Sequence, residues 1–219
     1  MQEPDYKAIL TAVGLAWRIV VAYQQRVFFL LDEIEAGFPE LTHSYWSPAY
    51  YSGPPKGSTK PSSKGKWTWD GFPYYSMDTW LTLPSQKSTS ALDSGDWFAV
   101  IRIDADSGFD VTDVGQKSAF SGPDPLRMLP ASETKSELRL YVCQVIEISG
   151  VGKTPSKLWS EDDDDDAEFG CWDDVPSLGI RRISWCASLE DLLAESGTSD
   201  FIKSIRAVLK ESGIPLMER

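Results

Sequence analysis

The 219-residue sequence predicts an α+β fold: one long N-terminal helix, a largely antiparallel sheet of about five to six strands, and two short C-terminal helices. Three observations lead to this prediction. Apolar residues recur at helical spacing near the start, strand-like runs fill the middle, and helix signals return near the end. Because the helical patterns do not alternate with the strands, a sheet built from βαβ repeats is not expected.

The first predicted element is a helix over residues 4–36, which Gly37 and Pro39 end. Its apolar residues alternate three and four positions apart along one face, which is the spacing of a coiled-coil seam. One polar residue, Gln24, interrupts the seam, and a lone polar seam residue often fixes the register of paired helices. The predicted seam comprises Leu10, Val13, Trp17, Val20, Gln24, Val27, Leu31 and Ile34.

Such a helix is about 50 Å long, which exceeds the diameter of a small domain. Two interpretations follow: either the chain's own sheet wraps the helix, or the helix binds a protein partner or a second copy. In the second case the expected anchors are Trp17, Val20, Val27 and Leu31, since buried aromatic and aliphatic side chains carry most interface energy.

A membrane-spanning role for this helix is not expected from the sequence. Arg18 and the run Gln24-Gln25-Arg26 interrupt the apolar stretch, and acidic residues precede it where a signal peptide carries basic ones. The sequence therefore favours a helix that protein buries.

Composition and charge narrow the classes of function. Apolar residues make up 42% and charged residues 25% of the chain, which is typical of a globular protein. The net charge of −12 disfavours nucleic acid and anionic membranes as partners unless a local patch overrides it. The three cysteines are widely spaced and form no C-x-x-C pair. We therefore expect no disulfide framework, no metal, no cofactor and a cytoplasmic protein.

The remaining chain, residues 38–219, is expected to form the α+β domain. Strands are predicted at residues 45–51, 67–75, 77–83, 97–103, 138–148 and 179–185. Ser188 is expected to cap a helix over residues 189–195, and Ser199 a helix over residues 200–211. Mobile loops are expected at 52–65 and 161–174, because the first is rich in Gly, Pro and Ser and the second is strongly acidic.

A basic and aromatic patch surrounds the first of these loops. It comprises Lys56, Lys60, Lys64, Lys66, Trp67 and Trp69. Lysines interleaved with aromatic rings suit single-stranded nucleic acid, and the same mixture suits a glycan. A nucleic-acid or glycan binder is therefore one alternative function, and four solvated lysines on a loop are the competing explanation.

An acidic pair gives the enzyme alternative. Asp104 and Asp106 follow a predicted apolar strand, and Glu147 lies near the end of another. If the two strands pair, three carboxylates converge in the manner of metal-dependent nucleases and nucleotidyltransferases. The competing interpretation is a solvated turn, since Asp-Ala-Asp-Ser-Gly is good turn chemistry.

The run Gly150-Val151-Gly152-Lys153-Thr154 resembles the end of a phosphate loop but lacks its first glycine, whose position Glu147 occupies. Pro155 is expected to prevent the helix that such a loop requires. With no intact catalytic motif, an enzyme is not favoured. The leading hypothesis is a non-enzymatic protein–protein interaction module, a subunit of a larger intracellular assembly that uses its N-terminal helix.

Overall fold

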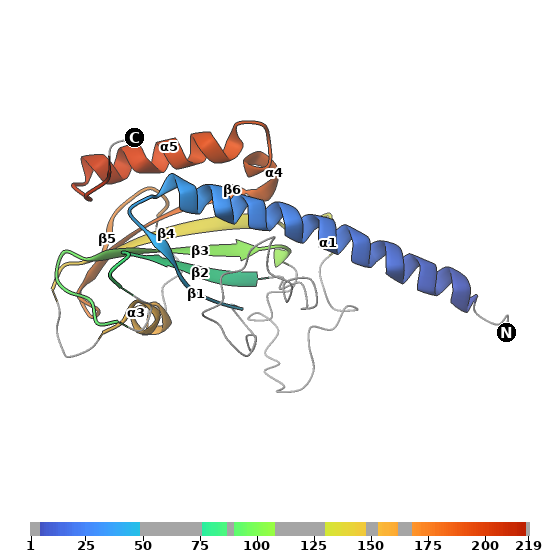
Figure 1. Ribbon diagram of the computed structural model, residues 1–219, viewed down its shortest axis with the longest axis horizontal. Coiled ribbons are helices and arrows are strands. Elements are labelled where there is room, and N and C mark those ends of the chain that lie inside the picture. Colours follow the sequence, from blue (N-terminus) through green and yellow to red (C-terminus); the bar gives the residue numbers. More distant parts are fainter. Residues whose placement is uncertain are drawn as a thin grey trace.

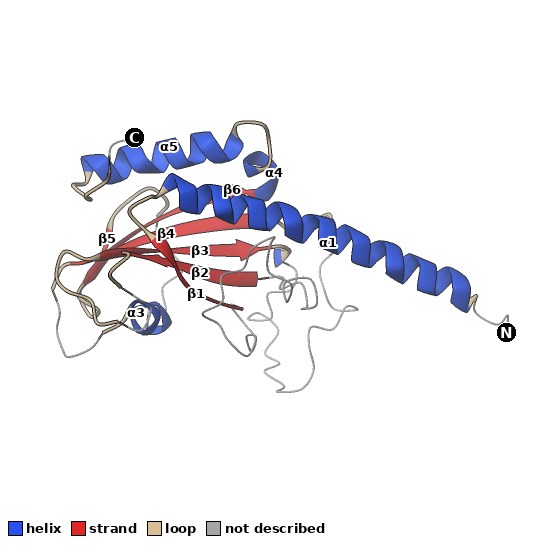
Figure 2. Ribbon diagram, viewed as in Figure 1, coloured by secondary structure: helices blue, strands red, loops and turns tan. Residues whose placement is uncertain are grey.

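A computed structural model describes residues 5–48, 76–86, 90–107, 130–147, 153–161 and 168–217. It confirms the predicted α+β fold, in which a long N-terminal helix and short C-terminal helices accompany an antiparallel sheet (Figures 1 and 2). The described helices are α1 (Tyr6–Gly37), α3 (Pro155–Glu161), α4 (Leu189–Leu192) and α5 (Gly197–Glu211). The described strands are β1 (Thr42–Pro48), β2 (Ser76–Thr82), β3 (Trp97–Asp104), β4 (Glu137–Val145), β5 (Asp173–Val175) and β6 (Ile180–Ser188).

The sheet follows a simple order. Its described strands lie in the sequence β1-β2-β3-β4-β6-β5, and every neighbouring pair is antiparallel. The central pair, β3 and β4, runs in register from Trp97 opposite Gln144 to Asp104 opposite Glu137. All of β2 and most of β3 and β4 are buried, so both faces of the sheet are covered there.

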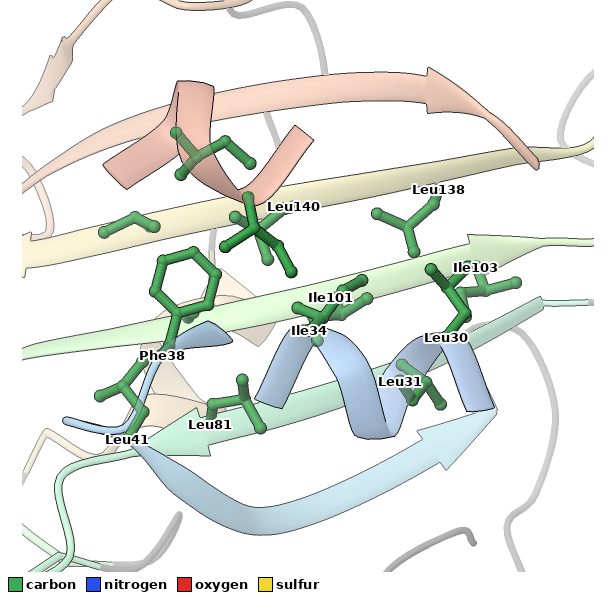
Figure 3. Packing of buried hydrophobic residues seen from close by; sticks show 14 of the residues in the cluster. Leu30, Leu31, Ile34, Phe38, Leu41, Leu81, Ile101, Ile103, Leu138 and Leu140 are labelled. Atoms are coloured by element: carbon green, nitrogen blue, oxygen red, sulfur yellow. The ribbon is translucent and has the colours of Figure 1, made fainter. Parts of the chain in front are cut away.

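One face of the sheet packs against the C-terminal half of α1 and against α5 (Figure 1). Alternation along the strands sends Ile101, Ile103, Leu138 and Leu140 to this face, because successive strand side chains point to opposite sides. Figure 3 shows Leu30, Leu31 and Ile34 of α1 over these residues. The last four turns of α1 are therefore part of the domain's main core.

The opposite face carries a second core under the short helix α3. Phe98, Val100 and Tyr141 point to this side and pack with Leu158 of α3. The rings of Tyr141 and Trp159 meet edge to face, with their centroids 4.7 Å apart. Helix α3 thus covers one end of this face.

Three details differ from the sequence prediction. Helix α3 begins at Pro155, which was expected to prevent a helix; a proline at the first helical position is tolerated because its missing N–H has no intrahelical acceptor. Strand β5 lies at the end of the predicted acidic loop, where it pairs with β6. Helix α5 begins at Gly197, so Ser199 lies inside it and is not its cap.

The cap of the preceding helix is confirmed: the Asp191 N–H donates to Ser188 Oγ at 3.0 Å. The predicted strand at residues 67–75, the predicted loop at 52–65 and residues 162–167 of the predicted loop at 161–174 lie outside the described residues.

Candidate functional site

The two halves of α1 differ sharply in burial. Val27 and Leu31, in the C-terminal half, are 5% and 4% exposed. Leu10 and Trp17, in the N-terminal half, are 70% and 48% exposed. No residue from 5 to 23 is buried, and we call residues 6–23 the arm. In Figure 1 the arm extends beyond the end of the sheet.

The exposed face of the arm continues the buried face of the core half. At 100° per residue, Val13, Trp17 and Val20 lie in line with Val27 and Leu31. Gln24, 9% exposed, is the first buried residue of the helix and marks where the sheet begins to cover it. The predicted seam therefore exists as one stripe, and the domain's described residues bury only its second half.

The arm is also apolar on its other side. Leu15 and Ile19 lie opposite the seam and are 54% and 70% exposed. An 18-residue window of α1 is apolar enough to cross a membrane by length and composition, and none of it is buried. Within the described residues, the sheet ends before the arm begins, so the domain's own sheet covers only the C-terminal half of α1.

Charges on the arm are few. Asp5 caps α1, since its Oδ1 accepts from the Lys7 and Ala8 N–H groups at 3.1 Å each. Lys7 and Arg18 lie on one narrow strip of the helix, about 16 Å apart along its axis. Between them the arm has no ionisable side chain.

The four predicted anchors divide between two environments. Trp17 is exposed and Val20 is half-buried, so both lie on the arm or at its root. Val27 and Leu31 belong to the core, where they contact the domain's own sheet, and they are not available to a partner. The helical periodicity identified the stripe but not the point at which the sheet stops covering it.

Several exposed apolar residues of the arm were not predicted as contacts. They are Tyr6, Ile9, Leu10, Val13, Leu15 and Ile19. Leu10 and Val13 were in the predicted seam, and Tyr6 continues its spacing by one further step. Nothing in the seam spacing pointed to Leu15 and Ile19.

The prediction that Glu147 lies beside Asp104 and Asp106 is wrong. Because β3 and β4 are antiparallel, Asp104 lies opposite Glu137, at the start of β4. Glu147 follows the other end of β4, ten residues from Glu137, which corresponds to about 33 Å along the strand direction. Among the described residues, no group of three possible metal ligands lies together.

Asp104 sits in a partly buried, charged surrounding. Burial raises its pKa above the usual carboxyl range, while the charges of Arg102 and Arg139 oppose that rise. Asp106 is half-buried beyond the strand end. The structure therefore keeps Glu147, the predicted third ligand, away from both carboxylates.

A network of polar contacts around Asp78 has a structural role on the sheet face that packs against α3. Arg102 donates to both carboxylate oxygens of Asp78, at 2.8 and 3.2 Å. The Trp159 indole N–H donates to the same carboxylate at 3.0 Å. The guanidinium also lies 5.4 Å from the centre of the Trp159 ring. This network ties β2, β3 and α3 together.

Neither lysine nor threonine of the Gly-Lys-Thr run faces a phosphate site. Lys153 donates through Nζ to the Leu178 carbonyl at 3.2 Å. Thr154 Oγ1 accepts from the Lys157 N–H at 3.3 Å, as the cap of α3. The two described residues of the run, Lys153 and Thr154, therefore make contacts within the fold, and Thr154 caps α3.

A groove of about 1110 Å³ lies between α1 and the pair α4 and α5. Phe29, Leu193 and Met217 supply apolar lining. Arg206 on its wall is occupied by Glu40, with N–O distances of 3.0 and 3.1 Å. The single histidine, His43, lies on β1 and is not part of this lining.

The basic and aromatic patch lies outside the described residues. Lys56, Lys60, Lys64, Lys66, Trp67 and Trp69 all fall in residues 49–75. The described part of the chain therefore leaves one prominent functional feature, the arm.

The fold and this feature define a class of protein: an α+β domain that carries an uncovered apolar helical arm. A protein-family model named PM0109 matches residues 3–213, so the chain belongs to the PM0109 family. The match includes the whole of the arm, and the family name states no activity. No curated protein and no solved structure matches the chain.

Proposed function

We propose that this protein is a non-enzymatic interaction module that joins a larger assembly through the arm. The observation that supports the proposal is the division of α1: one continuous apolar stripe is buried from Gln24 onward and exposed before it. A soluble monomer rarely exposes so large a contiguous apolar surface, and such surfaces mark interaction sites.

Energetics support an external contact. Each large apolar side chain contributes about 1.5–3 kcal/mol when it moves from water to an apolar environment. Besides Tyr6, six apolar residues of the arm are at least 48% exposed: Ile9, Leu10, Val13, Leu15, Trp17 and Ile19. Covering them releases several kcal/mol, which is enough to hold a domain in an assembly.

The catalytic alternative has less support. In the described residues, Asp104 and Asp106 lack a third ligand, and Thr154 of the Gly-Lys-Thr run caps α3. The proposal therefore depends on the arm.

The test compares one substitution on the arm with one in the core. Val13→Asp is expected to change the free energy of unfolding by less than about 0.5 kcal/mol, because Val13 lies outside the core. Leu31→Asp is expected to lower the free energy of unfolding by more than about 3 kcal/mol, because it places a charge in the core. Urea unfolding, followed by circular dichroism, measures both.

Sedimentation in buffer without detergent measures the second consequence. The wild type is expected to form species heavier than the 24.4 kDa monomer, and Val13→Asp with Trp17→Asp to restore the monomer. A monomeric wild type in which Val13→Asp destabilises as much as Leu31→Asp would show that the arm packs within its own chain. The proposed function would then fail.

A further inference from the structure

We infer that the arm inserts end-on into a lipid bilayer and holds the domain at the membrane surface. The inference rests on one part of the proposed function, that the arm makes the external contact, and it names a bilayer as the surface that the arm contacts. Four features of the arm carry it: its all-round apolarity, its length, its direction relative to the domain and the distribution of its charges.

The first feature is exposure on every side. Leu10 is 70% exposed on the seam side, and Leu15 and Ile19 are 54% and 70% exposed on the opposite side. A single partner helix covers only one stripe, so it leaves the opposite side in water. A helix that is apolar all round is suited to a large core or a membrane. A bilayer covers both sides at once.

The second feature is length. The arm has eighteen residues and spans about 27 Å, close to the hydrocarbon thickness of roughly 30 Å. Polar residues flank it at both ends, with Asp5 and Lys7 at one end and Gln24 and Arg26 at the other. Tyr6, which is 68% exposed, lies at the outer end, where aromatic residues are enriched in membrane helices.

The third feature is direction. The arm's seam points to the same side of α1 as the face that packs on the sheet, so a helix lying flat with its seam in lipid would push the domain into the bilayer. Figures 1 and 2 show instead that the arm extends past the sheet along the length of the molecule. A helix lying flat on its opposite side would keep the domain in water but would leave the seam residues uncovered, whereas end-on insertion covers both sides and keeps the domain in water.

The fourth feature is the position of Arg18, the one charge within the apolar stretch. It lies about 9 Å along the axis from Gln24, where the domain begins. A long arginine side chain reaches toward the headgroups while its methylenes remain in the apolar layer. Arg18 weakens insertion without preventing it.

Two other kinds of helix are also long and apolar enough to cross a membrane: the core helix of a soluble protein and a signal sequence. A core helix would be buried, whereas none of this window is buried. A cleaved signal sequence would be separable from the domain, whereas α1 continues without a break into the core residues Val27, Leu31 and Ile34. Both explanations conflict with the structure.

The test uses the full chain and two arginine substitutions on opposite sides of the arm. Val13→Arg lies on the seam, and Leu15→Arg lies opposite it. Binding to phosphatidylcholine vesicles is measured by flotation, with resistance to high-salt and alkaline washing as the sign of insertion. Circular dichroism and the unfolding midpoint confirm that each variant is folded.

We expect the wild type to float with the vesicles and to resist both washes. Each arginine near the middle of the apolar layer is expected to weaken binding by about 100-fold, equally for the two positions. Arg18→Leu is expected to strengthen binding by about tenfold.

Two outcomes would overturn the inference, and they differ in what else they remove. If the wild type does not float, but self-associates in a way that Val13→Arg abolishes and Leu15→Arg preserves, the arm is a one-sided protein contact and the proposed function stands. If neither arginine changes flotation or association, the arm is not the contact element and both proposals fail.

Discussion

At the scale of single residues, the sheet face that bears α3 shows how buried charge is tolerated. Asp78 is 4% exposed and is held by Arg102 and the Trp159 indole. Asp104, two positions along the same face from Arg102, is less well compensated, since burial outweighs its favourable neighbours. The ionised carboxylate of Asp104 is therefore expected to lower the stability of the fold.

The raised pKa of Asp104 predicts a pH dependence. An acid whose folded-state pKa is raised is destabilising when ionised, and the cost is relieved as the pH falls through that pKa and then the unfolded value. Asp104→Asn is therefore expected to unfold at a higher temperature than the wild type at pH 7. The difference is expected to narrow toward pH 3.

Thermal unfolding of both proteins between pH 3 and pH 8 measures this. Asp106→Asn, which removes a carboxylate beyond the end of the strand, serves as the control. A wild type that is the more stable of the two at pH 7 would show that ionised Asp104 stabilises the fold.

At the scale of elements, the turn between β5 and β6 locks the end of β4. The Gly179 carbonyl accepts from the Ile146 and Glu147 N–H groups at 2.9 and 3.1 Å. Gly179 has a φ of +70°, and a Cβ there would lie 1.9 Å from the Glu147 carbonyl oxygen. Only glycine both adopts this positive φ readily and leaves room for the Glu147 carbonyl.

Gly179→Ala is accordingly expected to cost about 3 kcal/mol or more, because the left-handed backbone and the displaced β4 end both contribute. Gly213→Ala is the matched control: its φ is +78° with nothing within 4 Å, so about 1 kcal/mol is expected. If urea unfolding shows the same loss of stability for both variants, the added Cβ at position 179 does not clash with the Glu147 carbonyl, and the prediction fails.

Elements also show what periodicity alone predicts. The strands over residues 77–83 and 97–103 were predicted to within one residue at either end, since their apolar runs are bounded by turn residues. Strand β5 was missed because its acidic residues read as a loop, and only pairing with β6 orders it. The sequence does not predict helix α3, because a proline ends a helix at most positions and is tolerated only at the first turn, where Pro155 lies.

At the scale of the whole molecule, α1 belongs to two environments. Its C-terminal half is covered by the sheet and α5, and its N-terminal half extends past them (Figure 1). The helical spacing predicted the length and the apolar stripe, because both are local properties of the sequence. It did not predict where coverage ends, because that depends on the length of strands far away in sequence.

The same limit applies to the carboxylates. Asp104 and Glu147 both follow apolar strands, and a parallel pairing would have brought them to one edge. The antiparallel register places them at opposite ends, and that register is a property of the assembled sheet.

The most direct test of the account asks whether the arm is uncovered in the dilute, monomeric chain. A thiol is introduced by Leu10→Cys, with Cys171→Ser and Cys186→Ser removing the more accessible native cysteines. Cys143, 1% exposed, remains as an internal standard for a buried thiol. Under native conditions the thiol at position 10 is expected to react with a water-soluble reagent within about tenfold of the unfolded-chain rate, while Cys143 reacts only on unfolding. Equal, slow reaction of both thiols would contradict the account, because the arm would then be enclosed by its own domain.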